Sequence, residues 1–274
     1  MMTPKQIVDQ ALAEFNPVGV YVGFSGGRDS ICVTHWMMTN VPGCKVFHAN
    51  TGVGIERTRE YVRATCKDYG WPLVEIRAKE DCGEDYDELV KEYGFPGPDH
   101  HQKMYDRLKG RAVAMLVRNT KKHRMDKVMI ASGIRYDESL IRMGYKGREI
   151  NTEGAQLWVN PIYWFTKQDR ANYIAEHHLP VNPISIELGM SGECGCGAYA
   201  QPGELKAWKR VDPEFGERIE ALQEKVLAKG FTWAWDGHPP EGGFNPDQGQ
   251  MFPGLCGSGC MKSAVVQEEL LSHD

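Results

Sequence analysis

Six consecutive residues near the N-terminus, Ser25-Gly26-Gly27-Arg28-Asp29-Ser30, constrain the fold more than any other feature of this chain. They follow the apolar run 18–24 and precede residues 31–38, whose composition is typical of a buried helix. A strand, a glycine-rich turn and a helix in this order predict an anion site, because glycines let the backbone approach a phosphate and N–H groups at the helix start point at it. The two serines add hydroxyl donors. Asp29 is expected to cap the helix or to position a metal or a neighbouring donor.

Segments typical of strands and helices alternate along most of the chain. Strands are expected over residues 18–24, 45–49, 73–77, 127–132 and 157–160. Helices are expected from Pro4 onward and over residues 31–39, 56–69, 84–93, 101–123 and 166–178. This alternation predicts an α/β, Rossmann-like, doubly wound fold with a mostly parallel five-stranded sheet. Such sheets bind ligands at the carboxyl ends of their strands. The Ser25–Ser30 turn, Asn50-Thr51-Gly52 and the loop 132–135 should therefore meet at one site.

The pattern changes after Leu179. Helices are expected near 202–210 and 213–229, and the stretch 237–259 that follows contains 11 Gly or Pro among its 23 residues. A structureless stretch of this length in a compact domain is expected either to be disordered or to be held by something else. We therefore expect a first domain over residues 1–185 and a helical, Cys-rich extension over residues 186–274 that packs on it.

The charge of the chain is unevenly distributed. The formal net charge is −5, but residues 101–149 hold 13 Lys or Arg against 5 Asp or Glu. This basic block favours a polyanionic ligand, either a nucleotide or a nucleic acid, and a solvated helix face is the alternative. The chain shows no run of 18 apolar residues and no signal-peptide pattern, so we expect a cytoplasmic protein without a membrane partner.

Four of the 8 cysteines form two close pairs, Cys194-x-Cys196 and Cys256-x3-Cys260. Cysteines of a cytoplasmic protein are expected to be reduced, catalytic or bound to metal. Four thiolates suit either zinc or a four-cysteine iron–sulfur cluster, and a site without metal stays open. A metal would also explain how the Gly/Pro-rich stretch is held. Cys32 and Cys66 lie in apolar helical patterns and are expected to fill the core.

Four motifs occur in order over about residues 15–200. They are Ser25–Ser30, the strand and loop 46–52, the segment 133–142 with its Gly-Ile-Arg…Glu-Ser…Arg pattern, and the segment 161–183. Together they resemble the phosphoadenosine phosphosulfate reductase family, within the pyrophosphate-loop, or adenine-nucleotide α-hydrolase, superfamily. The resemblance identifies residues 1–185 as the pyrophosphate-loop domain. It implies ATP or a sulfonucleotide as the ligand, with Mg²⁺ as an accompanying ion.

The resemblance and the residue chemistry together give a predicted site. The expected nucleotide-binding residues are Ser25, Gly26, Gly27, Arg28, Asp29, Ser30, Asn50, Thr51, Gly52 and Gly133. The expected catalytic residues are Asp29, Lys109, Arg135, Glu138 and Arg142, with Arg107 and Arg111 adding to the cationic half of the site. An arginine fork suits bidentate binding of phosphate or sulfate, and Glu138 could orient Arg135 or Arg142. Cys194, Cys196, Cys256 and Cys260 are expected to bind the metal, and the family favours a [4Fe-4S] cluster over zinc.

The chain also departs from the family. Assimilatory reductases carry a C-terminal Glu-Cys-Gly-Leu-His whose cysteine attacks the sulfonucleotide, whereas this sequence ends in residues 268–274 without it. We therefore expect ATP-dependent adenylation with pyrophosphate release, followed by sulfur transfer from a sulfur donor. Reduction of phosphoadenylyl or adenylyl sulfate to sulfite by a thioredoxin-like reductant is the first alternative. The second is a nucleic-acid-binding component of a DNA or tRNA sulfur-modification complex. A homodimer is also compatible with the sequence.

Overall fold

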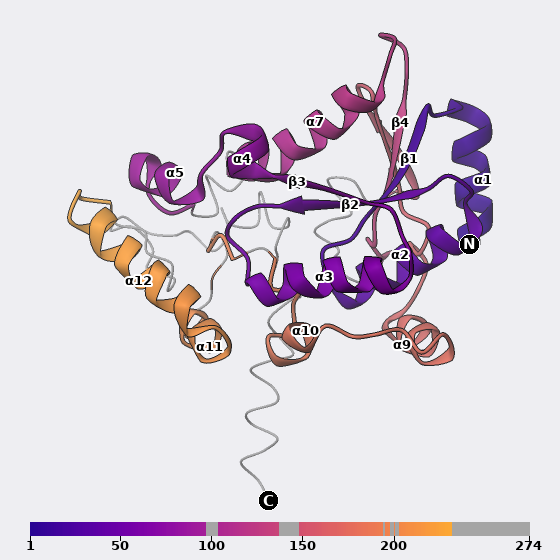
Figure 1. The fold of residues 1–274 in the computed structure, drawn as a ribbon. Helices are drawn as coiled ribbons and strands as arrows, with labels where there is room; N and C mark the ends of the chain where they lie inside the picture. The colour runs from indigo at the N-terminus through magenta and orange to yellow at the C-terminus, as the bar shows by residue number, and fades with distance from the viewer. Residues whose placement is uncertain (97–103, 137–147, 194, 198–199, 201–202, 232–274) are drawn as a thin grey trace, which may run out of the picture.

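A computed structural model describes residues 1–96, 104–136, 148–193, 195–197, 200 and 203–231. Its centre is a sheet of six strands in the order β3-β2-β1-β4-β6-β5 (Figure 1). The strands are β1 Gly19–Gly23, β2 Lys45–Asn50, β3 Leu73–Arg77, β4 Val128–Ala131, β5 Ile150–Glu153 and β6 Gln156–Val159. All neighbouring pairs are parallel except β5 and β6, which are antiparallel. The predicted doubly wound, mostly parallel fold class is confirmed.

The predicted count of five strands is wrong by one, because β5 was missed. Ile150–Glu153 is short and largely polar, and it forms the edge of the sheet, where only one side of a strand needs a partner. It pairs with β6 through a tight hairpin in which Gly154 has a φ of 56°. A four-residue polar segment of this kind lacks the apolar alternation by which strands are recognised.

Helices connect the strands and cover both faces of the sheet (Figure 1). They are α1 Pro4–Phe15, α2 Arg28–Asn40, α3 Glu56–Asp68, α4 Ala78–Cys82, α5 Tyr86–Tyr93, the π-helical turn η2 Asp106–Gly110, α7 Arg111–Thr120, α9 Lys167–Glu176, α10 Pro183–Glu187, α11 Glu204–Val211 and α12 Pro213–Leu227. The sequence signals for two helix starts are confirmed. Thr3 caps α1, and Thr166 with Asp169 forms a capping box at α9.

Alternating side chains of the strands pack into two separate layers of the core, one on each face of the sheet. Val22 of β1 and Met129 of β4 face one layer, which α1, α2, α3 and α9 cover. Tyr21 and Ile130 face the opposite layer, which α7 covers. Cys32, Cys44 and Cys66 are buried in the first layer, so the expectation that Cys32 and Cys66 fill the core is confirmed.

A third apolar cluster joins the C-terminal helices to loops of the sheet. Trp208 of α11 is buried and its ring lies 4.7 Å from that of Phe215 of α12. The same cluster includes Val53 after β2 and Tyr86 of α5. The boundary at residues 185 and 186 stays a prediction. In the part of the chain that the model covers, no helix is both long enough and apolar enough to span a membrane.

The strand order creates one topological switch point. From β1 the chain moves outward to β2 and β3, and it then returns to β4 on the other side of β1. The loops after β1 and β4 therefore diverge in opposite directions at the carboxyl edge. Ligands of open α/β sheets bind in the crevice at such a point.

Candidate functional site

The Ser25–Ser30 loop leaves β1 at this switch point and begins α2. Ser30 Oγ accepts a hydrogen bond from Gly27 N at 3.0 Å and donates one to Gly27 O at 2.9 Å, while Ser25 Oγ donates to Ser30 Oγ at 3.2 Å. These bonds fix the first turn of α2 with its N-terminus at the crevice. A helix N-terminus held in this way favours an anion.

The two glycines of the loop differ in what the fold demands of them. Gly26 has a φ of 79°, and an added Cβ would lie 2.8 Å from Thr58 Cγ2, so the fold itself requires glycine there. Gly27 has an ordinary φ of −85°, and an added Cβ would meet nothing nearer than Ser191 Cβ at 3.4 Å. The fold therefore has room for a Cβ at Gly27, so packing alone does not require glycine there.

The loop after β4 packs directly on the start of α2. A Cβ at Gly133 would lie 2.9 Å from the carbonyl carbon of Asp29, which leaves room only for glycine. Ser132 Oγ donates to Asn160 Oδ1 at 2.5 Å, which ties this loop to the end of β6. Two of the three loops that the sequence placed at one site thus touch each other.

Asp29 holds two arginines at the crevice. Arg135 is buried, and its Nε donates to Asp29 Oδ1 at 2.5 Å. Arg170 of α9 donates from Nη1 to Asp29 Oδ2 at 3.0 Å. Burial, and then the charge of Arg170, lower the pKa of neighbouring Arg28, as expected where guanidinium groups gather. Asp29 therefore binds two arginines at the start of α2, and its role at the site stays a prediction.

The third predicted loop, Asn50-Thr51-Gly52, is held by side chains from outside it. Asn50 Nδ2 donates to Glu75 Oε1 at 2.7 Å, and Asn50 Oδ1 accepts from Gly52 N at 3.1 Å. Arg63 forms an ion pair with the same Glu75 at 2.7 Å. Hydrogen bonds from Arg63, and then from Asn50, lower the pKa of Glu75 to about 2.

The segment that carries the first cysteine pair runs along the loop after β2. Main-chain groups of this segment accept three hydrogen bonds: Thr58 Oγ1 donates to Ser191 O at 2.8 Å, Ile55 N to Gly192 O at 2.8 Å, and Tyr86 Oη to Cys196 O at 2.8 Å. Because Ser191 also lies beside Gly27, the segment extends from the Ser25–Ser30 loop to the buried Cys196. Cys194, Cys256 and Cys260 lie outside the described residues, and the described residues contain no cluster of three or more metal-ligating side chains.

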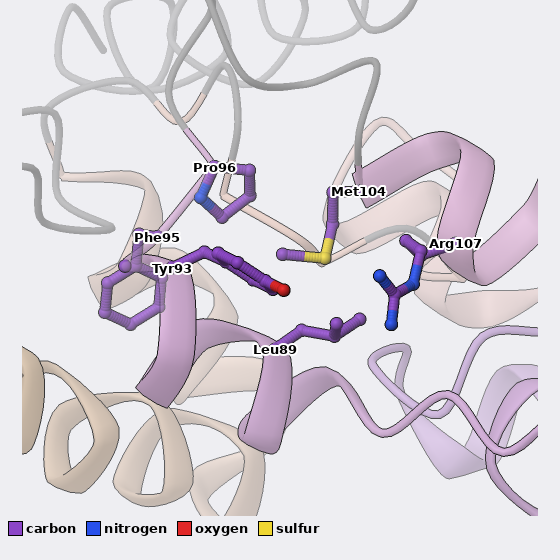
Figure 2. A pocket seen from close by; sticks show the side chains of 7 residues that line it. Leu89, Tyr93, Phe95, Pro96, Met104 and Arg107 are labelled. Carbon is purple, nitrogen blue, oxygen red and sulfur yellow. The ribbon is translucent and has the colours of Figure 1, made fainter.

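Arg107 and Arg111 lie at η2 and the start of α7, where both bind buried Glu84. Arg107 Nε donates to Glu84 Oε2 at 2.7 Å, and Arg111 forms an ion pair with the other carboxylate oxygen. Arg107 also lines a cavity of about 130 Å³ (Figure 2). The other lining residues are Leu89, Tyr93, Gly94, Phe95, Pro96 and Met104. Lys109 lies in η2 between the two arginines, whereas Glu138 and Arg142 lie outside the described residues.

Two contributors to the site were missed by sequence reasoning. Arg170 reaches Asp29 from a helix 141 residues away in sequence, and no local pattern marks it. Glu193 binds Thr51 across 142 residues. The only sequence signal for Glu193 is that a single acidic residue precedes Cys194-Gly195-Cys196.

The comparisons identify the family of the chain. A family model described as the phosphoadenosine phosphosulfate reductase domain matches residues 19–187. An uncharacterised protein of Methanocaldococcus jannaschii is 29% identical over 215 residues, which are 77% of this chain and 42% of that protein. The chain therefore spans less than half the length of this relative.

Among solved structures, a phosphoadenylyl-sulfate reductase of Candida auris in a phosphate complex shares the fold. It has a TM-score of 0.51 and 17% identity over 69% of this chain and 85% of its own. A U34-tRNA thiolase of Methanococcus maripaludis with a [4Fe-4S] cluster gives a TM-score of 0.42 and 12% identity, over 99% of this chain and 80% of its own.

The low pKa of Glu75 predicts a pH-dependent contribution to stability. An unfolded glutamate has a pKa of about 4.3, so the stabilisation is complete above that value and is lost as the pH falls toward about 2. Urea unfolding at several pH values between about 6 and 2.5 should show a shallower acid loss for Glu75→Gln than for wild type. Glu60→Gln, at an exposed position of α3, is the matched control. Equal pH slopes for wild type and Glu75→Gln would contradict this role.

Proposed function

Because the chain belongs to the phosphoadenosine phosphosulfate reductase family, we propose that it is an enzyme that binds an adenine nucleotide at the Ser25–Ser30 loop and uses it in sulfur chemistry. One observation carries the proposal. Ser191 of the cysteine-bearing segment lies beside Gly27 of the loop, which supports a single site for phosphate-binding and sulfur-bearing groups. This position of the segment relates the cysteines to the nucleotide.

In this proposal the loop backbone and the neighbouring arginines bind different parts of the nucleotide. The backbone of the Ser25–Ser30 loop binds the phosphates, with Gly133 and the loop 50–52 completing the nucleotide site. Asp29 orients Arg135 and Arg170 toward the anionic part of the substrate, and Arg142 and Lys109 add to it. Both carboxylate oxygens of Asp29 already bind arginine, so the phosphates themselves would hold an accompanying Mg²⁺.

The preferred reaction is adenylation followed by sulfur transfer. An acceptor oxygen attacks the α-phosphorus of ATP, and pyrophosphate leaves with the electron pair of the broken bond. A sulfur nucleophile from a donor then attacks the activated acceptor, and AMP leaves. Cationic side chains stabilise the charge that develops on the phosphoryl oxygens in the first step. The basic residues of 101–149 suit a nucleic-acid acceptor.

Thiol-dependent reduction of phosphoadenylyl or adenylyl sulfate is the second candidate. The arginines around Asp29 favour it, because a planar guanidinium binds sulfate as well as phosphate. A cysteine thiolate would attack the sulfur, the nucleotide would leave, and a second thiol from a thioredoxin-like protein would release sulfite.

The proposed domains, 1–185 for nucleotide binding and 186–274 for the Cys-rich extension, assign the metal ligands to the extension. Cys194, Cys196, Cys256 and Cys260 would hold a [4Fe-4S] cluster or zinc. Four thiolates satisfy either group. Such a metal centre would hold the extension in place and would take part in sulfur transfer beside the nucleotide.

Nucleotide binding is tested by Gly27→Val. Its side chain would fill the space of a phosphate, while the fold has room for the Cβ. Calorimetric affinity for ATP or adenylyl sulfate should fall at least about a hundredfold, or about 2.7 kcal/mol, with an unchanged melting temperature. Gly110→Val is the control, since Gly110 also has no neighbour within 3.4 Å of an added Cβ. Wild-type affinity in folded Gly27→Val would contradict the site.

The metal centre is tested on protein purified without oxygen. A [4Fe-4S] cluster predicts a brown protein with about four iron and four sulfide per chain. Cys196→Ser should lower that content, and Cys82→Ser should leave it unchanged. A colourless protein with one zinc per chain would support the four cysteines as ligands and would contradict the [4Fe-4S] cluster. Ready alkylation of all four thiols in metal-replete protein would reject both metals.

The reaction class is tested by two parallel assays. Pyrophosphate release from ATP, stimulated by an acceptor and a sulfur donor, is the expected result. The competing assay supplies adenylyl or phosphoadenylyl sulfate with thioredoxin. Sulfite release at enzymatic rates, abolished by a single Cys→Ser change that retains the metal, would establish the reductase reaction instead.

A further inference from the structure

Four polar side chains meet in the interior beneath the loop after β2. His48 and Thr51 come from β2 and its loop, Arg59 from α3, and Glu193 from the cysteine-bearing segment. Each of these residues is less than 9% exposed. Buried charged groups of this kind usually add little net stability compared with well-packed apolar side chains. This cluster joins four segments of the chain, so its main effect is to fix how these segments lie against one another.

One oxygen of Glu193 holds the loop after β2. Glu193 Oε1 accepts from Thr51 N at 3.1 Å and lies 3.2 Å from Thr51 Oγ1, which also reaches Glu193 O at 3.1 Å. The backbones are equally close, because a Cβ at Gly54 would lie 2.7 Å from Glu193 Cα. The segment and the loop therefore fit in one register only.

The other oxygen of Glu193 faces His48 of β2 and Arg59 of α3. Glu193 Oε2 lies 3.6 Å from His48 Nε2 and 3.6 Å from Arg59 Nε. These three buried atoms have no hydrogen-bond partner within the described part of the chain. The carboxylate therefore faces the Arg59 guanidinium, a donor, at a distance longer than a hydrogen bond.

His48 extends this cluster to the nucleotide loop. His48 Nδ1 lies 2.7 Å from Phe24 O, and because a carbonyl only accepts, Nδ1 carries the hydrogen. Phe24 immediately precedes Ser25, and Glu193 immediately precedes Cys194. His48 thus lies between the residue that precedes the Ser25–Ser30 loop and the residue that precedes Cys194.

We propose that Glu193 is a positioning residue that fixes Gly195 and Cys196 against the β2 loop and couples these residues to nucleotide at the Ser25–Ser30 loop. The inference rests on the proposed function only for the identity of the ligand. Glu193→Gln keeps an oxygen for Thr51 but removes the charge that faces Arg59 and His48. Thr51→Val removes the hydroxyl bonds and keeps the size of the side chain.

The test measures alkylation of each cysteine by peptide mapping, with and without ATP, on protein kept without oxygen and treated with a chelator so that no metal shields the thiols. Glu193→Gln and Thr51→Val should each speed alkylation of Cys196 about tenfold, as expected for the loss of one hydrogen bond to a charged group. Cys32, Cys44 and Cys66 in the sheet core should react at wild-type rates, which reports an intact fold. Glu187→Gln, on an exposed residue of α10, is the matched control.

The coupling to nucleotide is measured separately. ATP should slow alkylation of Cys196 in wild type, and this protection should disappear in Glu193→Gln although ATP still binds. Unchanged reactivity of Cys196 in both variants, or a parallel rise at the core cysteines, would overturn the positioning role. Persisting ATP protection in Glu193→Gln would overturn the coupling. Absence of ATP binding in wild type would instead reject the proposed nucleotide, and the comparison of alkylation rates without ATP would still decide the positioning role.

Discussion

The carboxylate of Asp29 is the contact on which the arrangement of the site depends. It lies in the first turn of α2, and its two oxygens receive Arg135 from the loop after β4 and Arg170 from α9. Since Arg135 is buried, loss of the carboxylate would leave a buried cation without its partner, a change that typically costs about 3–5 kcal/mol. Gly133 also approaches the backbone of Asp29 closely, and the ion pairs of Asp29 help hold these two loops together. The switch-point crevice is thus shaped by an ion cluster as well as by strand order.

The opposite wall of the crevice is built by close backbone packing. Added Cβ atoms would lie within 2.8 Å of neighbouring atoms at Gly54, Gly192 and Gly195. Glycine at these positions lets the cysteine-bearing segment lie against the loop after β2 and against Trp208 and Phe215 of the extension. Side chains at these points would separate the two layers. Arginines thus lie on the β4 side of the Ser25–Ser30 loop, and the glycine-rich segment with Cys196 lies on the β2 side.

Sequence reasoning recovered what local patterns encode. The alternation of strands and helices gave the fold class, and the rule for parallel sheets placed the loops after β1, β2 and β4 at one edge. It could not find β5, because a short polar edge strand carries little periodic signal. It also could not pair Arg170 with Asp29 or Glu193 with Thr51, since each contact spans more than 140 residues. Charge type alone placed Arg107 and Arg111 in the cationic half of the site, whereas buried Glu84 binds both.

Burial of Cys32, Cys44 and Cys66 limits which cysteines can act as nucleophiles or metal ligands. Burial raises the pKa of the Cys32, Cys44 and Cys66 thiols to about 12, so at neutral pH they are protonated. The thiolate is the form that attacks sulfur or binds metal, and these three residues supply neither activity. A reactive or ligating sulfur must therefore come from the remaining cysteines. Of these, Cys196 lies five residues after Ser191, whose side chain lies beside Gly27 of the loop, and this proximity is the observation on which the proposed function rests.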